Sequence, residues 1–337
     1  RASQRRTRAV TQLTDRTRRA LTELVLSLEA DPSALVRFQL ALTIGSIDAA
    51  AALTAIQRLA ARDIHDPWMR SALLTASPNR AAGVFEMCFG ESARGVIPQS
   101  PAAVAFARDL MSIVGARHDA RELAAVVDVI GRDAGKPWWR PAALDGLAQG
   151  IRRSGAGREL LLREDAAIAR IRDGLLALLA SPDTATRQAA RRLAAEFSWP
   201  DSPALSERLA AELEIAANLE APEKERIGAI AFAGSAPLEK ISGPLLDLLR
   251  ADEAIPVQRA AIAALARSGS PEAARMLLDK SRWLAYTPAL RDAVIDALLA
   301  REECLPVLLD AIESGVVPAW AIDSARRERL VKSHVAS

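Results

Sequence analysis

Apolar residues recur along this chain at the spacing of one helix face, and short polar breaks that carry proline separate the apolar runs. The stretch from residue 31 to 45 reads DPSALVRFQLALTIG. Asp31 suits an N-cap, Pro32 suits the first helical position, and Gly45 suits the left-handed residue that ends a helix. A single helix cannot bury so broad an apolar face, so the pattern predicts a second helix packed against it.

The same order of cap, proline, apolar residue and arginine returns downstream. Residues 47–61 are predicted to form a helix, Asp66 opens the next copy, and its Arg70 follows Arg37 by 33 residues. Recurrence at a period of about 30 to 45 residues indicates a solenoid, in which each unit packs on its neighbours. The interval of 70 residues from Arg70 to the next copy indicates one degenerate unit between them, which includes a predicted helix from Pro101 to about Val114. The later copies carry Arg140, Arg187, Arg226, Arg259 and Arg291.

These observations predict an all-α protein. We expect residues 1–337 to form a single α-solenoid, a superhelix of about seven to eight helix pairs, because compact single-core domains rarely exceed about 250–300 residues. An aromatic share of 4% and the absence of convincing strand alternation agree with helices. Two irregular stretches, 90–100 and 153–158, are predicted loops, and each is either a tolerated insertion or a surface for a partner.

The net charge of the chain does not indicate a partner. The chain has 44 Lys and Arg against 42 Asp and Glu, a net charge of +2, which is too balanced for strong non-specific binding to nucleic acid. The basic lead-in at residues 1–20 holds seven arginines and one acid, Asp15. It fits an arm for phosphate-rich partners, but we expect a helix or linker that continues from preceding structure.

The cysteines argue against a disulfide-rich protein, and the hydropathy argues against a membrane-spanning one. Cys88 and Cys304 are expected to be small buried side chains rather than parts of a disulfide framework. No run of about 18 uncharged apolar residues occurs, so the sequence predicts no transmembrane segment, and the N-terminus lacks the apolar core of a secretory signal.

The repeating second helix of the type Asp-Pro-x-x-x-Val-Arg resembles the HEAT repeat over nearly the whole chain. Two stretches, 35–42 running on to 66–70, and 282–301, resemble the HEAT region of the planctomycete (PVC-type) membrane-bound dehydrogenases of the heme-binding family. The resemblance implies an internal segment of a longer exported protein, located in the periplasm or cell envelope. It also implies a β-propeller before this segment and a haem c domain after it.

The sequence itself carries no Cys-x-x-Cys-His motif, so we expect no cofactor in this segment and place any haem in a separate C-terminal domain. We also expect no catalytic and no metal-binding residue. The three histidines, His65, His118 and His334, are scattered without metal-ligand spacing, and there is no phosphate-binding loop. Asp292 and Asp296 lie four residues apart on one helix, as solvated helix faces often place carboxylates.

Two sets of residues are candidates for contacts. The repeat arginines could form a binding ladder, but we expect them to pack along the stack and to pair with acids or carbonyls of neighbouring units. Trp138 and Trp139 could stack on a base or a sugar, or pack between repeats, and they are the possible interaction surface.

The sequence is consistent with two functions. The first is a non-enzymatic scaffold for protein–protein interaction or for positioning flanking domains of the same chain. The alternative is a HEAT-like DNA-binding enzyme of the alkylpurine DNA glycosylase type, which the six tryptophans and many arginines keep open and the near-neutral charge disfavours.

Overall fold

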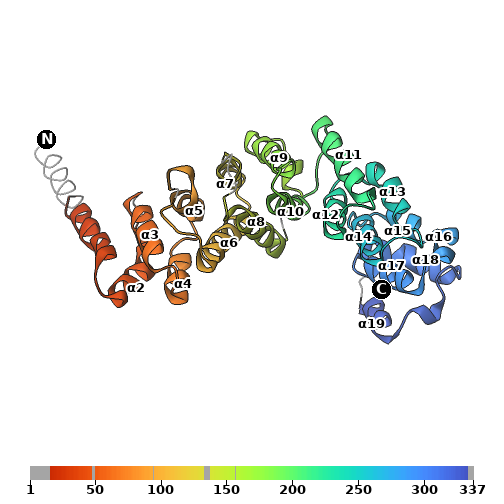
Figure 1. Ribbon diagram of the computed structural model, residues 1–337. Coiled ribbons are helices and arrows are strands. Elements are labelled where there is room, and N and C mark those ends of the chain that lie inside the picture. The colour runs from red at the N-terminus through yellow and green to blue at the C-terminus, as the bar shows by residue number, and fades with distance from the viewer. Residues whose placement is uncertain (1–15, 48–49, 94, 133–136, 156, 333–337) are drawn as a thin grey trace, which may run out of the picture. The chain divides into compact units, whose positions relative to one another are not determined.

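The computed structural model describes residues 16–47, 50–93, 95–132, 137–155 and 157–332. Within these ranges the chain forms α-helices joined by turns and short 3₁₀ helices, and no strand occurs (Figure 1). The prediction of an all-α repeat stack is therefore confirmed. Contacts divide the chain into two compact units, residues 1–156 and 157–337, and the boundary falls inside the irregular stretch predicted at 153–158.

The first unit has two layers of helices, and each helix contacts the next member of its own layer. A helix at residues 16–27 and the 3₁₀ turn η1 (Leu28–Ala30) precede them. The first layer consists of α3 (Ala50–Asp63), α5 (Ala81–Phe89) and α7 (Ala120–Arg132). The second layer consists of α2 (Ala34–Thr43), α4 (Pro67–Thr75), α6 (Pro101–Arg117) and α8 (Arg140–Ser154). The degenerate unit predicted between Arg70 and Arg140 is thus the one that contains α6.

The second unit repeats this arrangement (Figure 1). Its first layer consists of α9 (Ala166–Leu179), α11 (Pro203–Ala217), α13 (Leu238–Asp247), α15 (Pro271–Leu277) and α18 (Leu305–Glu313). Its second layer consists of α10 (Thr184–Ala194), α12 (Glu223–Ala233), α14 (Ile255–Ala266), α17 (Pro288–Leu299) and α19 (Ser324–Lys332). The short helix α16 (Lys280–Ala285) follows α15 and precedes α17 in the chain. Five 3₁₀ turns complete the described chain, at Ile44–Ser46, Glu91–Ala93, Leu160–Leu162, Glu302–Cys304 and Ala319–Ala321.

The proline punctuation read from the sequence marks helix starts. Among the described residues, prolines occupy the first helical position of α4, α6, α11, α15 and α17, where no amide hydrogen bond is lost. Each of these helices is capped by the preceding side chain: Asp66, Ser100, Ser202, Ser270 and Thr287 accept a hydrogen bond from a first-turn amide.

Three predicted boundaries need correction. α2 begins at Ala34, and Asp31 instead accepts a hydrogen bond from the Ser33 amide at 2.8 Å, which forms a turn before the helix. Ile47 is not part of the helix expected at 47–61, and the described helix, Ala50–Asp63, ends two residues later than expected. The helix expected at 101–114 continues to Arg117, where His118 ends it in the left-handed conformation with φ of 53°.

Small residues allow α6 and α8 to approach closely. A Cβ placed on Gly146 would lie 2.1 Å from the carbonyl oxygen of Arg108, and one on Gly150 would lie 2.2 Å from that of Ser112. Gly146 and Gly150 are four residues apart and therefore share one face of α8. This contact requires glycine at both positions.

Candidate functional site

The repeat arginines lie at the start of the second-layer helices, and Arg37 and Arg226 each donate two hydrogen bonds to an acid of the next repeat. Arg37 shows the pattern most completely: its Nε and Nη2 donate to the two carboxylate oxygens of Asp63 at 2.6 and 2.8 Å, and its Nη1 donates to the carbonyl of Asp31 at 2.7 Å. Asp63 ends α3 in the next repeat. The hydrogen bond that Arg37 donates to Asp63 is the main cause that raises the pKa of Arg37. Arg37 is 4% exposed, so this pair belongs to the interior.

Arg226 repeats this geometry at the start of α12. Its Nη1 donates to one carboxylate oxygen of Glu253 at 2.9 Å, its Nη2 donates to the other at 2.5 Å, and its Nε donates to the carbonyl of Ala216 at 2.8 Å. The hydrogen bonds from Arg226 lower the pKa of Glu253 against the opposing effect of burial. One guanidinium therefore ties the end of α11 to the turn before α14.

Three other repeat arginines donate mainly to carbonyls just before their own helices. Arg70 bonds the carbonyl of Ile64 at 3.2 Å, and Arg187 bonds that of Ser181 at 2.8 Å. Arg291 bonds the carbonyls of Trp283 and Leu284 at 3.0 and 3.1 Å and lies over the Trp283 ring at 5.6 Å. Arg140 is buried at the start of α8. These contacts neutralise the free carbonyl ends of the preceding segments.

Arg259 departs from the expectation. Its side chain is exposed, and among the described residues it forms no hydrogen bond or ion pair. Gln258, which is 2% exposed, takes the inward position and donates to the carbonyl of Arg250. Adjacent helical residues point about 100° apart, so a shift of one residue turns the arginine outward. The sequence pattern identified the repeat correctly and the inward residue wrongly.

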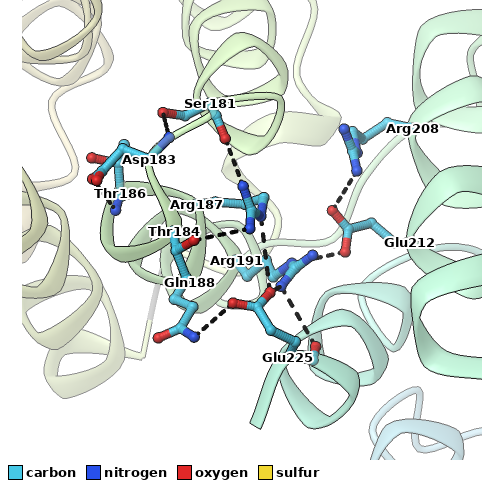
Figure 2. A network of polar contacts seen from close by, with 10 residues as sticks. All are labelled: Ser181, Asp183, Thr184, Thr186, Arg187, Gln188, Arg191, Arg208, Glu212 and Glu225. Carbon is cyan, nitrogen blue, oxygen red and sulfur yellow. Dashed lines mark hydrogen bonds and ion pairs between the residues drawn. The ribbon is translucent and has the colours of Figure 1, made fainter. Parts of the chain in front are cut away.

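An extensive polar cluster lies where α10, α11 and α12 meet (Figure 2). Arg191 is fully buried between two carboxylates: its Nε lies 2.8 Å from Glu212 Oε2, and its Nη1 contacts Glu225. Glu212 is also fully buried and receives Arg208 at 2.7 Å through its other oxygen. Because a buried charge without its partner is strongly destabilising, this cluster fixes the mutual position of the three helices.

Glu225 is the acid that two repeats share. Gln188 of α10 donates to its Oε1 at 2.8 Å, and Arg187 lies 3.9 Å from its Oε2 (Figure 2). Burial alone would raise the pKa of Glu225, but the hydrogen bonds from Gln188 and Arg191 and the charge of Arg187 lower it below its ordinary value. Glu225 therefore remains ionised at neutral pH.

Arginines also join the loops that follow the second-layer helices. Arg80 donates to the carbonyls of Ile47 and Gly45 at 2.9 and 3.1 Å, and Arg117 donates to the carbonyl of Pro78 at 2.9 Å. These bonds cross 33 to 39 residues of sequence, about one repeat. The sequence pattern did not identify either arginine, although Arg117, the last residue of α6, carried a usable signal. Arg80 is the N-cap of α5 and carried none.

The loop predicted at 153–158 begins only after Ser154, the last residue of α8, and Arg158 within it makes an internal contact. Arg158 donates through its guanidinium to the carbonyl of Arg267 at the end of α14, and its own carbonyl accepts the Ser198 amide at 2.6 Å. Partial burial of the Arg158 guanidinium is the main cause that lowers its pKa. This residue thus ties three loops of the second unit together.

The two candidate tryptophans belong to an aromatic cluster in the first unit. Trp139 is 6% exposed and meets Phe85 edge to face at 5.3 Å between ring centroids. Trp138 is half-buried and meets Phe89 at 5.9 Å, also edge to face. Such edge-to-face contacts are the preferred geometry of packed aromatic rings. Trp68, in contrast, is 73% exposed and does not occupy an equivalent environment.

The described residues bring together no group of three or more His, Cys, Asp or Glu side chains that could hold a metal ion. Asp292 and Asp296 instead hold Arg326 of α19, at 2.8 and 2.9 Å. His118 contacts the hydroxyl of Ser154, but that hydroxyl also bonds two carbonyls at the C-terminus of α8. The negative end of a helix dipole opposes the oxyanion that a serine nucleophile would generate. His334 lies outside the described residues.

Comparison with known proteins assigns no class: no family model matches the chain, and no curated protein matches it. No described helix is long and apolar enough to cross a bilayer. Both cysteines, Cys88 and Cys304, lie in the described ranges, are buried and form no disulfide there.

Proposed function

We propose that this chain is a helical-repeat scaffold that binds a protein partner or positions flanking domains, and that it is not itself an enzyme. The observation that carries the proposal is that large apolar side chains remain exposed at equivalent positions of successive repeats. Leu35 and Trp68, each two residues before a repeat arginine, are 77% and 73% exposed.

The second unit has a comparable series. Leu219, Leu284 and Trp320 are 67%, 67% and 81% exposed, and each lies four residues before a second-layer helix, which begins at Glu223, Pro288 or Ser324. Isolated exposed apolar residues are common on protein surfaces, but Leu35 and Trp68 recur in the consecutive helices α2 and α4, and Leu284 and Trp320 recur before the consecutive helices α17 and α19, which gives two short rows. Extended rows of this kind are the binding surfaces of repeat proteins.

The polar side chains support the same proposal. The repeat arginines that could have contacted nucleic acid mostly donate to carboxylates and carbonyls of the stack, as Arg37, Arg226 and Arg291 do. Their donors are therefore not available to phosphates. The parent suggested by the sequence resemblance, an exported dehydrogenase with a separate haem c domain, and its cell-envelope location remain part of the proposal.

The proposal is tested by retention of partner proteins from an extract of the source organism on the immobilised chain. The paired variants are Leu35→Glu with Trp68→Glu, and the matched control is Glu223→Gln with Glu313→Gln, because both glutamates are exposed and lie outside the apolar positions. We expect a defined protein to bind the wild type and the control and to be lost from the apolar variant at unchanged helicity. Equal retention by all three proteins would contradict the proposal, and salt-sensitive affinity for duplex DNA would favour the glycosylase-type alternative.

A further inference from the structure

A hollow of about 360 Å³ opens beside the aromatic cluster of the first unit. It lies where α5 ends, next to the 3₁₀ turn Glu91–Ala93 and against the last turn of α7. We call it the aromatic hollow, and its walls include Glu86, Phe89, Glu91, Val129, Arg132 and Trp139. Its size falls at the lower end of sites for small ligands, about 300–1,000 Å³, and suits one long side chain.

Aromatic rings form one wall of this hollow. Phe89 and Trp139 both line it, with ring centroids 6.1 Å apart and planes inclined at 51°. Trp138 packs against Phe89 from outside the lining at 5.9 Å. These packed rings are fixed in position, and their π faces attract cations.

The charges at the hollow are predominantly negative. Glu86 and Glu91 are exposed, and in the described part of the chain neither carboxylate has an ion pair. Arg132 is the opposing charge, and Asp128 lies 3.8 Å from it across one helical turn. The carbonyl end of α5, the negative end of the helix dipole, also points to this place.

We propose that the aromatic hollow binds an arginine side chain presented by a basic segment of a partner protein. The proposal rests on the scaffold function and specifies the chemistry of its partner. A guanidinium is planar, stacks on aromatic rings and donates hydrogen bonds to carboxylates, so it matches the ring wall and the two glutamates, while the lining Arg132, beside Asp128, opposes it. An ammonium of lysine matches the carboxylates alone and stacks less well.

The test is a fluorescence-anisotropy titration of the full chain with labelled glycine–serine peptides that contain three arginines, three lysines or three citrullines. Citrulline keeps the shape of arginine and lacks its charge. We expect the arginine peptide to bind most tightly, and the citrulline peptide to bind at least tenfold more weakly, the loss of about one charge-assisted hydrogen bond.

The decisive variant is Glu86→Gln with Glu91→Gln, which preserves side-chain size, and the control is the exposed pair Glu223→Gln with Glu313→Gln. We expect at least tenfold weaker arginine binding for the first pair and no change for the control. Equal arginine affinity in both variants, or equal affinity for citrulline or lysine, would overturn the assignment. If the chain retains a partner protein but the titration shows equal affinities, the hollow is wrongly assigned and the scaffold function stands. If the titration shows the expected differences but no partner is retained, the scaffold function is wrong and the arginine site stands.

Discussion

Replacing Arg226 by alanine is the perturbation that probes the repeat contacts most sharply. Arg226 and Glu253 have side chains that are 6% and 3% exposed, and the arginine supplies two hydrogen bonds to the carboxylate and one to Ala216. Arg226→Ala leaves the Glu253 carboxylate buried with the Ala254 amide as its described donor at 2.8 Å. Removal of one partner of a buried ion pair costs about 3–5 kcal/mol, mainly because the remaining charge lacks solvation.

Native-state hydrogen exchange, resolved by helix, measures this loss. Stability in a repeat stack is close to a nearest-neighbour sum, so protection should fall most in α11, α12 and α14 and little in the first unit. Arg259→Ala is the matched control, because Arg259 is an exposed arginine on the next second-layer helix, and it should change stability by no more than about 0.5 kcal/mol. Equal effects of the two substitutions would refute the assignment of Arg226 as the inward repeat arginine.

The pH dependence provides a second readout of the same pair. Arg226 lowers the pKa of Glu253 in the folded state below its ordinary value of 4.5. A lowered folded-state pKa contributes stability above pH 4.5, and that contribution is lost as the pH falls through the folded-state value. The difference in free energy of unfolding between wild type and Arg226→Ala should therefore shrink below pH 4.5. A difference that stays constant to pH 3 would contradict this origin.

Two further predictions concern packing. Gly146→Ala should destabilise the first unit by about 1–3 kcal/mol or more in thermal unfolding, because its Cβ would lie 2.1 Å from a backbone oxygen. Gly131→Ala is the control: its Cβ would meet no neighbouring atom within 4 Å, so it should be neutral or stabilising by up to about 1 kcal/mol. The reverse order would contradict the close α6–α8 contact. Burial raises the pKa of the Cys88 thiol to about 12. Cys88 should therefore resist a disulfide reagent at pH 8 in the native protein and react in urea. Rapid labelling of the native protein would show that this part of the core is open.

The sequence predicted the helical stack because its signals are local. Proline at the first helical position, a capping side chain before it and an apolar residue every three or four positions act within one helix, so α4, α6 and α17 were placed closely. The inward residue of α14 was misassigned because one residue of register decides whether Gln258 or Arg259 faces the core. Local pattern cannot fix that register.

Partners that come from another helix could not be predicted from the sequence. Arg191 lies one turn after the repeat arginine Arg187, and it resembles any charged residue on a solvated face until α11 and α12 bring Glu212 and Glu225 against it. Asp63 and Glu253 likewise acquire their roles from an arginine of the preceding repeat. The loop contacts of Arg80 and Arg117 depend on the turn geometry after α2 and α4 in the same way.

Removal of the last repeat tests the central claim, a stack held together mainly by contacts between neighbours, most directly. A chain that ends at Ala300 lacks α18 and α19 and keeps every second-layer helix from α2 to α17. Hydrogen exchange should then show weakened protection in α15 and α17, which lose their neighbours, and nearly unchanged protection in α10 and α12. Loss of protection throughout residues 157–300 would contradict the account, because it would show one indivisible core in place of a stack of repeats.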